Sequence, residues 1–332
     1  MKFSSIIYVL LVFSFLTMTA LSIYYYLQIQ QDKVKISQAV SSGTPLPDYH
    51  FALIGEELDH DYWRLVGKGA KQNETEYDVF VEYEGPERSN PEEQLKLLDK
   101  AIKKKVDGII VQALNDEFTP LIDLAVGKGI PVITIDTDSP DSLRSAYIGT
   151  DNYAAGQLAG KALIEDTGGE AVVGIVTGRF NNTHHSLRVE GFRDVIEQEA
   201  GIDIVAIEES NIDRIGAEEK AHNMLTEHKE ITALYGTSAL DGTGISEAAE
   251  SLDRQDLYVI TFDTLEENLR LLEKGKVDAL VEQQPWKMGH QSVKIMTDLI
   301  NEKQVKKIHH TNSSIVRKQN LPYRQDLRGG RQ

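Results

Sequence analysis

The feature that most constrains the fold is an alternation of short apolar runs with amphipathic stretches, beginning near residue 49. A short apolar run predicts a buried strand, and apolar residues recurring three and four positions apart predict a helix. In the first half of this pattern the predicted strands are 50–55, 78–83, 108–111 and 130–136, and the predicted helices are 62–72, 91–104 and 120–128. Buried strands separated by helices indicate a parallel sheet that is covered on both faces.

The same alternation then starts again. The predicted helices are 152–164, 186–199, 216–228 and 242–251, and the predicted strands are 171–176, 204–207, 233–236 and 257–262. Two consecutive sets of this kind predict an α/β fold with two similar lobes, each a doubly wound parallel sheet.

Polar and aromatic side chains follow several of the predicted strands. Ligands of open parallel sheets bind beyond the carboxyl ends of the strands, so these side chains are candidates for a binding site. They are residues 59–63, Gln112, Asp136, Ser238, Asp263 and Gln283–Gln284. Carboxylates accept charge-assisted hydrogen bonds from hydroxyl groups, and aromatic rings pack on the apolar face of a sugar ring. The sequence therefore predicts a site for an uncharged, polyhydroxylated ligand.

Residues 6–27 contain no charged side chain and end in an aromatic cluster, Tyr24–Tyr26. As a helix this segment would extend about 33 Å, which is enough to cross the core of a bilayer. It predicts a transmembrane anchor with residues 1–5 in the cytoplasm, and a cleaved signal peptide is the alternative. Residues 28–47 form a polar spacer. Both alternatives place the rest of the chain outside the cytoplasm.

Two features of the composition exclude whole classes of function. The sequence has no cysteine, which excludes disulfide scaffolds, cysteine-based metal sites, thiol nucleophiles and a thioether-linked lipid. Its net charge is -17, which argues against general nucleic-acid binding because that function needs a basic face.

Several stretches resemble, in their order and spacing, the bacterial ribose/galactose-type sugar-binding proteins. These proteins have the type I periplasmic binding protein fold, which they share with the ligand domain of LacI-type repressors. The stretches include FALIGEELDHDYWRLVGKGA (51–70), GIPVITIDTD (129–138) and VITFDTLEENLRLLEKGKVDALVEQQPWKMG (259–289). The resemblance implies an N-terminal lobe of 48–150 and 284–312 and a C-terminal lobe of 151–283 and 313–332. It also implies that the lobes close on a ligand by hinge bending.

The resemblance implies ligand positions as well. They are His60, Tyr62, Trp63, Gln112, Asp136, Thr137, Ser186, Ile212, Ser238, Asp263 and Gln283. Tyr62 and Trp63 take the place of the family's stacking aromatic residues. Ser186 stands where a second ligand-binding arginine is common, although Arg179 and Arg188 are near it in the sequence.

These motifs also have simpler structural interpretations. Asp136 and Asp263 could cap the turns or helices that follow their strands. Glu56-Glu57 is most simply solvated surface. The pairs His184-His185 and His309-His310 lack the spacing of metal ligands, so neither a metal nor a cofactor is predicted.

Together these features predict an extracytoplasmic solute-binding protein that captures a monosaccharide or similar polyol and performs no chemistry. The resemblance implies a membrane partner, either an ABC sugar importer or a sensor histidine kinase. The absence of a cysteine for a lipid anchor favours the sensor slightly. The alternative is a secreted carbohydrate-active enzyme, in which Asp136 and Asp263 would act as acid and as nucleophile or base.

Overall fold

The computed structural model describes residues 13, 17–19, 22 and 47–323. The predicted transmembrane segment, 6–27, lies almost entirely outside these residues, as do the predicted spacer and the last nine residues of the chain, 324–332. Within the described part of the chain, no helix is long and apolar enough to cross a membrane.

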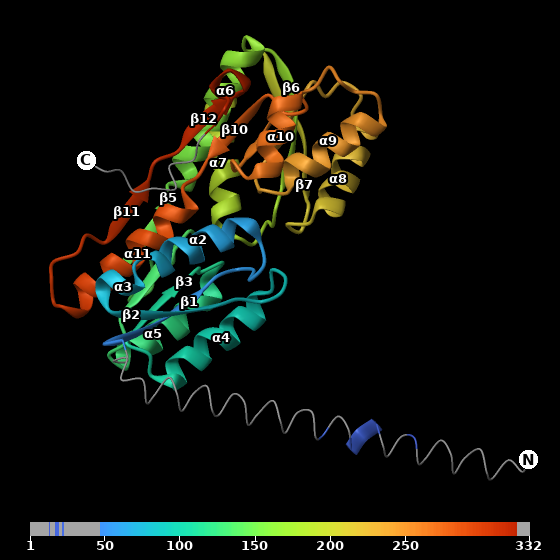
Figure 1. Cartoon of the computed structure of the whole chain (residues 1–332). Helices are drawn as coiled ribbons and strands as arrows, with labels where there is room; N and C mark the ends of the chain where they lie inside the picture. The colour runs from blue at the N-terminus through green and yellow to red at the C-terminus, as the bar shows by residue number, and fades with distance from the viewer. Residues whose placement is uncertain (1–12, 14–16, 20–21, 23–46, 324–332) are drawn as a thin grey trace, which may run out of the picture. The chain divides into compact units, whose positions relative to one another are not determined.

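The first lobe is built on a sheet of six parallel strands (Figure 1). In the order β11-β5-β4-β3-β1-β2 these strands are Ile308–Thr311, Ala146–Thr150, Val132–Ile135, Gly108–Val111, Tyr49–Ile54 and Val79–Glu84. The helices of this lobe are α2 (Asp61–Gln72), α3 (Glu74–Tyr77), α4 (Pro91–Lys104), α5 (Thr119–Gly127) and α11 (Pro285–Ile300), with a 3-10 turn at Asp116–Phe118.

The second lobe has a sheet of six strands with the same plan. In the order β12-β10-β9-β8-β6-β7 they are Ser314–Arg317, Ala279–Glu282, Tyr258–Phe262, Ala233–Gly236, Ala171–Thr177 and Ile202–Glu209. The neighbouring strands pair in parallel except β12, which pairs antiparallel with β10. The helices are α6 (Asn152–Thr167), α7 (Thr183–Ile196), α8 (Arg214–Glu227), α9 (Asp241–Ser251) and α10 (Glu266–Lys274), with a 3-10 turn at Lys318–Asn320.

The chain passes between the two sheets three times. The passages lie between β5 and α6, between β10 and α11, and between β11 and β12. The carboxyl ends of the central strands of both sheets carry the loops that face the space between the lobes.

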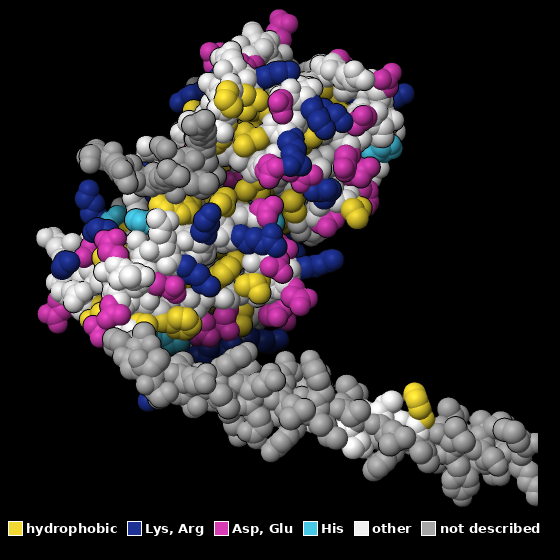
Figure 2. Space-filling model, in the orientation of Figure 1, with side chains coloured by type: hydrophobic (Ala, Val, Ile, Leu, Met, Phe, Trp, Pro, Cys, Tyr) yellow, Lys and Arg dark blue, Asp and Glu magenta, His cyan; other side chains and the backbone are white. Residues whose placement is uncertain are grey.

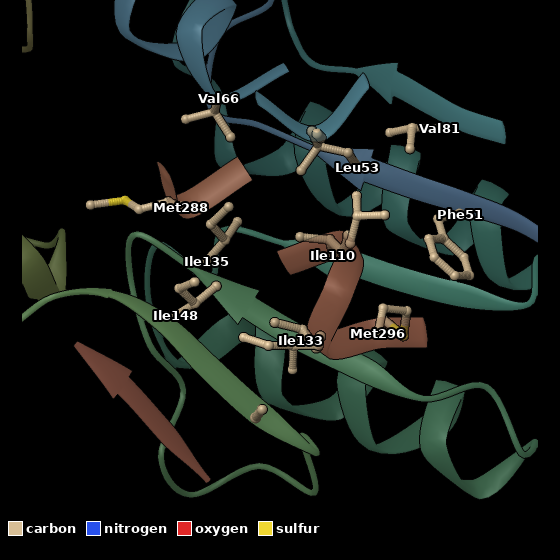
Figure 3. Close-up of a cluster of buried hydrophobic side chains, with 14 of the residues drawn as sticks. Phe51, Leu53, Val66, Val81, Ile110, Ile133, Ile135, Ile148, Met288 and Met296 are labelled. Atoms are coloured by element: carbon tan, nitrogen blue, oxygen red, sulfur yellow. The ribbon is translucent and has the colours of Figure 1, made fainter. Parts of the chain in front are cut away.

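Each sheet is buried on both faces. In the first lobe, Phe51, Leu53 and Ile110 of the sheet pack with Val66 of α2 and Met288 of α11, which cover one face (Figure 3). A second apolar cluster fills the opposite face under α4 and α5. The surface has charged side chains of both signs interspersed over the visible face (Figure 2). Apolar side chains buried on both faces of a sheet are the pattern expected for parallel strands.

The predicted elements between residues 50 and 262 are present, with several bounds shifted and one displacement that affects the site. The elements α3, β5, α10, α11, β11 and β12 were not among those predicted. The helix expected at 186–199 is α7, Thr183–Ile196, and it begins three residues earlier. The cause is a contact between the lobes. The Thr183 amide donates to the Leu114 carbonyl of the first lobe at 3.1 Å, so that lobe satisfies one of the free N–H groups at the helix start.

Candidate functional site

The first lobe contributes two aromatic rings from the start of α2. His60 caps this helix, because its Nδ1 accepts from the Tyr62 amide at 3.2 Å. Tyr62 and Trp63 are buried and meet edge to face, with ring centroids 5.8 Å apart. Trp63 lies against Gly55, where a Cβ atom would come within 2.6 Å of the indole. Because glycine has no Cβ atom, the indole ring can pack directly against the backbone at the end of β1.

Two aspartates occupy equivalent positions at the ends of central strands. Asp136 follows β4 and Asp263 follows β9, and both have left-handed backbone conformations, with φ of 66° and 74°. This conformation is uncommon for residues other than glycine and is often found at functional sites. The two lobes therefore present one carboxylate each in the same strained geometry.

Each aspartate is held by a glutamine from the neighbouring strand. Gln112, which follows β3, donates through Nε2 to Asp136 at 2.9 Å. Gln283, which follows β10, donates through Nε2 to Asp263 at 2.9 Å. The Tyr62 hydroxyl also donates to Asp136. These contacts hold each carboxylate in a defined position at the end of its strand.

Burial controls the protonation of both aspartates. Desolvation raises the pKa of Asp136, and it raises the pKa of Asp263 to about 6, while the nearby Arg188 guanidinium acts in the opposite direction. Both carboxyls can therefore titrate closer to neutrality than exposed ones.

Arg188 is the cation of the site, and its side chain is 2% exposed. Its guanidinium donates to Asn152, to the Thr237 carbonyl and to Gln283 at 2.8–2.9 Å. It also lies over the Phe262 ring, 3.9 Å from the centroid. Three hydrogen bonds and a ring contact fix this guanidinium near the carboxyl ends of the strands in the second sheet.

A pair of buried histidines lies beside Arg188 on α7. Their rings are 4.0 Å apart. His184 Nδ1 is 2.8 Å from the Thr137 hydroxyl of the first lobe, and His185 Nδ1 is 3.0 Å from the Thr237 hydroxyl. Burial lowers the pKa of both imidazoles well below the usual value, so both are neutral at pH 7. Within the described residues no group of three or more His, Asp or Glu side chains could hold a metal ion.

These side chains line one cavity between the lobes. Of the residues that the sequence singled out, the cavity wall includes His60, Tyr62, Trp63, Asp136, Ile212, Ser238, Asp263 and Gln283. Gln112 and Thr137 lie behind the wall. Gln112 Nε2 donates to Asp136 and to the Thr137 hydroxyl, which in turn contacts His184.

Ser186 lies outside this cavity, so the structure does not bring it together with the other predicted residues. Its hydroxyl donates to the Phe180 carbonyl at 2.9 Å on the outer side of α7. His184 and Arg188 are four residues apart on α7 and share its cleft side, whereas Ser186, two residues from each, faces away from them. Arg188, and not Ser186, therefore borders the cavity.

The wall includes six further residues: Glu56, Glu57, His184, His185, Arg188 and Ala239. The interpretation of Glu56-Glu57 as solvated surface is wrong for Glu56, which is 7% exposed. Its carboxylate accepts from Ser89 at 2.7 Å and from Asn182 of the second lobe at 3.3 Å. Its position just after β1 was the available signal, since strand ends carry the site in such sheets.

Gln112 Oε1 is a buried polar atom that makes no hydrogen bond to any residue that the structure describes, and it lies behind the cavity wall. The Ser238 hydroxyl borders the cavity, and its hydrogen bond with Asp241 helps to lower the pKa of that carboxyl. Of these two groups, Ser238 is therefore the one that a ligand in the cavity can reach.

Comparisons with known proteins agree with this geometry. The sequence pattern of a family described as the periplasmic binding protein domain matches residues 51–304. The chain is 25% identical over 259 residues to the D-allose-binding periplasmic protein of Escherichia coli K12, covering 75% of this chain and 83% of that protein.

Two solved structures extend the comparison. GanP, a glucose-galactose binding protein from Geobacillus stearothermophilus, is 51% identical, with a TM-score of 0.82 over 83% of this chain and 99% of that one. A chain of a XylFII-LytSN complex is 35% identical, with a TM-score of 0.79 over 82% of this chain and 99% of that one.

Proposed function

Because the chain belongs to the periplasmic binding protein family, with the type I fold of its sugar-binding members, we propose that it captures a neutral hexose between its lobes. The protein acts outside the cytoplasm, as such binding proteins do. It presents the closed, sugar-loaded form to a partner in the membrane.

The observation that carries this proposal is the pairing of Asp136 with Asp263. They stand at equivalent strand ends of the two lobes, each held by a glutamine, and both border the same cavity. Each carboxylate can accept from two adjacent hydroxyls of a sugar, and Tyr62 and Trp63 supply an apolar surface for its ring.

The charge of the cavity favours an uncharged ligand. Arg188 is the one arginine or lysine of the cavity wall within the described residues, and four carboxylates also border it. A sugar acid would add a further negative charge to this group. The likeness to GanP, described as a glucose-galactose binding protein, supports a hexose rather than a pentose.

Ligand binding couples to closure because both lobes contribute contacts. A sugar that reaches Asp136 and Asp263 together contacts both lobes only in the closed form, so it shifts the equilibrium toward closure. The lobe boundaries for this motion are 48–150 with 284–312, and 151–283 with 313–332.

For the partner, we favour the extracellular domain of a sensor histidine kinase. The likeness to a chain solved in a XylFII-LytSN complex supports a protein partner of this kind. An ABC sugar permease is the other candidate, supported by relatives named for ribose import. With either partner, residues 6–27 would hold the protein at the membrane as an uncleaved anchor, and would release it if they form a cleaved signal peptide.

The alternative of a carbohydrate-active enzyme is not favoured. The relatives that the chain resembles are named as binding and import proteins.

A thermal-unfolding screen of the full-length chain tests the sugar. We expect D-galactose or D-glucose to raise the free energy of unfolding by RT ln(1 + [L]/Kd), and the melting temperature with it, and D-galacturonate to have no effect. Stabilisation by the sugar acid alone would contradict the proposal. Release of a new product from an added glycoside would favour the enzyme instead.

A further inference from the structure

The sheet of the second lobe ends in a strand with a free edge. β7 is the outermost strand of that sheet, and within the described residues it pairs only with β6 (Figure 1). A free edge carries unpaired N–H and C=O groups that can pair with another strand. Such an edge can accept an extended segment from another protein.

A groove runs between this edge and the outer side of α7. Its floor is formed by the half-buried side chains of Val189, Ile204 and Ile207, and Phe180, 58% exposed, stands at one end. The hollow beside Phe180 has a volume of about 460 Å³. The groove therefore offers an apolar floor beside an open strand edge.

The rim of the groove is acidic. Glu190, Asp194, Glu197, Glu199 and Asp203 border it, and Arg193 is the only cation among the lining residues. Arg193 pairs with Glu197 at 2.9 Å, whereas Glu190, Glu199 and Asp203 make no ion pair within residues 47–323. The groove therefore has uncompensated negative charge.

The outer strand of the first lobe does not share this property. On β2, Glu82 and Glu84 pair with Lys104 and Lys100 of α4. The acidic groups beside that edge are thus neutralised within the chain. Unlike the β2 edge, the β7 edge therefore has neighbouring acidic side chains that make no ion pair within residues 47–323.

The helix that borders the groove also borders the sugar site. His184, His185 and Arg188 lie on the cleft side of α7, and Ser186, Val189 and Glu190 lie on the groove side. A rigid helix with two such faces can transmit a change at one face to the other.

The end of the groove is also tied to lobe closure. Phe180 lies between Arg179, which donates to the Ser89 carbonyl of the first lobe at 3.3 Å, and Asn182, which donates to Glu56. The Phe180 amide donates to Glu209 at the end of β7 at 2.7 Å. Separation of the lobes would break the Arg179 and Asn182 contacts and release the segment that carries Phe180.

From these observations we infer that the α7–β7 groove is a docking surface for an extended protein segment. The segment adds a strand to β7, places apolar side chains on the groove floor and pairs Lys or Arg side chains with the acidic rim. The inference rests on the proposed function, since the partner that reads the closed form would supply this segment.

The test uses a defined peptide and the full-length chain in a nonionic detergent. The probe is a fluorescein-labelled decapeptide of alternating Val/Ile and Lys/Arg, followed by fluorescence anisotropy. Two control peptides have the same length: one with two apolar residues replaced by Pro, which cannot form a regular strand, and one with Glu for every cation. We expect saturable binding of the probe peptide and no saturable binding of either control peptide.

A pair of double variants separates docking from general charge attraction. Glu190→Lys/Asp203→Lys reverses one charge on each side of the groove. Glu219→Lys/Glu247→Lys makes the same change in net charge at two exposed positions on α8 and α9. We expect the groove variant to bind the probe about tenfold more weakly, and the control within about twofold of the original chain. Equal losses, or tight binding of the Pro peptide, would overturn the inference.

Sugar dependence distinguishes this inference from the proposed function. If both hold, the hexose that stabilises the protein tightens probe binding, and the probe tightens sugar binding by the same factor. The groove variant should keep its sugar-induced stabilisation. If the probe binds specifically at the groove but no hexose stabilises the protein or changes probe binding, the docking surface is supported and the proposed sugar ligand is contradicted. If a hexose stabilises the protein but the probe does not bind specifically at the groove, the proposed sugar ligand is supported and the docking surface is contradicted.

Discussion

The Thr137 hydroxyl of the first lobe lies 2.8 Å from His184 Nδ1 of the second lobe. This contact links Gln112 and Asp136 on one side of the cleft with the start of α7 on the other. The cavity wall is therefore assembled only when the lobes are together, which is the geometry that a sugar between Asp136 and Asp263 would stabilise.

Arg188 should be essential to both the fold and the site. Arg188→Met removes a buried cation from three acceptors and from the two aspartates, so we expect a loss of about 3–5 kcal/mol in the free energy of unfolding. Ser186→Ala, on the opposite side of the same helix, should change it by less than about 0.5 kcal/mol and leave sugar binding intact. Urea unfolding and sugar titration of both variants check this. Loss of sugar binding in Ser186→Ala would reinstate the sequence-based assignment.

Much of the fold could be predicted from the sequence. The segments 91–104, 108–111 and 233–236 have the predicted bounds, because strong local periodicity and capping residues mark them. The start of α7 could not be predicted, since its first amide is satisfied by Leu114 from the other lobe.

The residues of the cavity wall that follow strands could be predicted from the sequence, whereas those buried by contacts between the lobes could not. Asp136 and Asp263 follow apolar strands directly, so their place is visible in the sequence. Glu56 belongs to a residue type that is usually exposed, and its burial becomes visible only through its contact with Asn182 of the other lobe. Ser186 was assigned the place that Arg188 occupies, and because the two residues are two positions apart on α7, they lie on different faces of the helix.

The Ser238 hydroxyl should matter more to the ligand than to the fold, since it borders the cavity. Ser238→Ala removes its hydrogen bond with Asp241, which keeps its bonds from the Ser210 hydroxyl and the Ser238 amide, so we expect a loss of at most about 1 kcal/mol in the free energy of unfolding. Sugar affinity should fall about fivefold, which corresponds to the loss of one neutral hydrogen bond. Thr237→Val is the matched variant, because the Thr237 hydroxyl contacts Thr177 and His185 and does not border the cavity. It should lower stability without that loss of affinity, and calorimetry with thermal unfolding distinguishes the two results.

Glu56 should make stability depend on pH. Burial raises its pKa to about 7 from an ordinary value of 4.5. A carboxyl group with a raised pKa holds its proton more tightly in the folded protein. Its contribution to stability is therefore complete below pH 4.5 and is lost as the pH rises toward 7. The two pKa values correspond to a loss of about 3 kcal/mol.

Glu56→Gln removes this loss while keeping the shape of the side chain. Compared with the original chain, we expect the variant to gain about 2–3 kcal/mol more at pH 8 than at pH 5, measured by urea unfolding. Taking the difference at each pH cancels the other titrating groups. Glu247→Gln on exposed α9 is the control and should show no such trend. A gain that is the same at both pH values would refute the role of Glu56.

Close packing of α2 on α11 should depend on glycine. A Cβ atom at Gly289 would lie 1.9 Å from the Val66 carbonyl oxygen, so the helices must separate in Gly289→Ala. We expect a loss of about 1–3 kcal/mol, as for other overpacked cores. At Gly127 in α5 a Cβ atom meets nothing within 4 Å of the described structure. Gly127→Ala should therefore stabilise the protein by about 0.5–1 kcal/mol. Thermal unfolding of the two variants gives opposite signs if the packing is as described.

The most direct test of the central claim is calorimetric titration of D-galactose and D-glucose into the full-length chain and its Asp136→Asn and Asp263→Asn variants. Each substitution keeps the shape of the side chain and removes the charge that strengthens its hydrogen bonds to hydroxyls. We predict one sugar per chain in the original protein and an affinity about 10- to 100-fold weaker in each variant. Binding that is unchanged in both variants, or no binding of any neutral hexose by a folded original protein, would contradict the account.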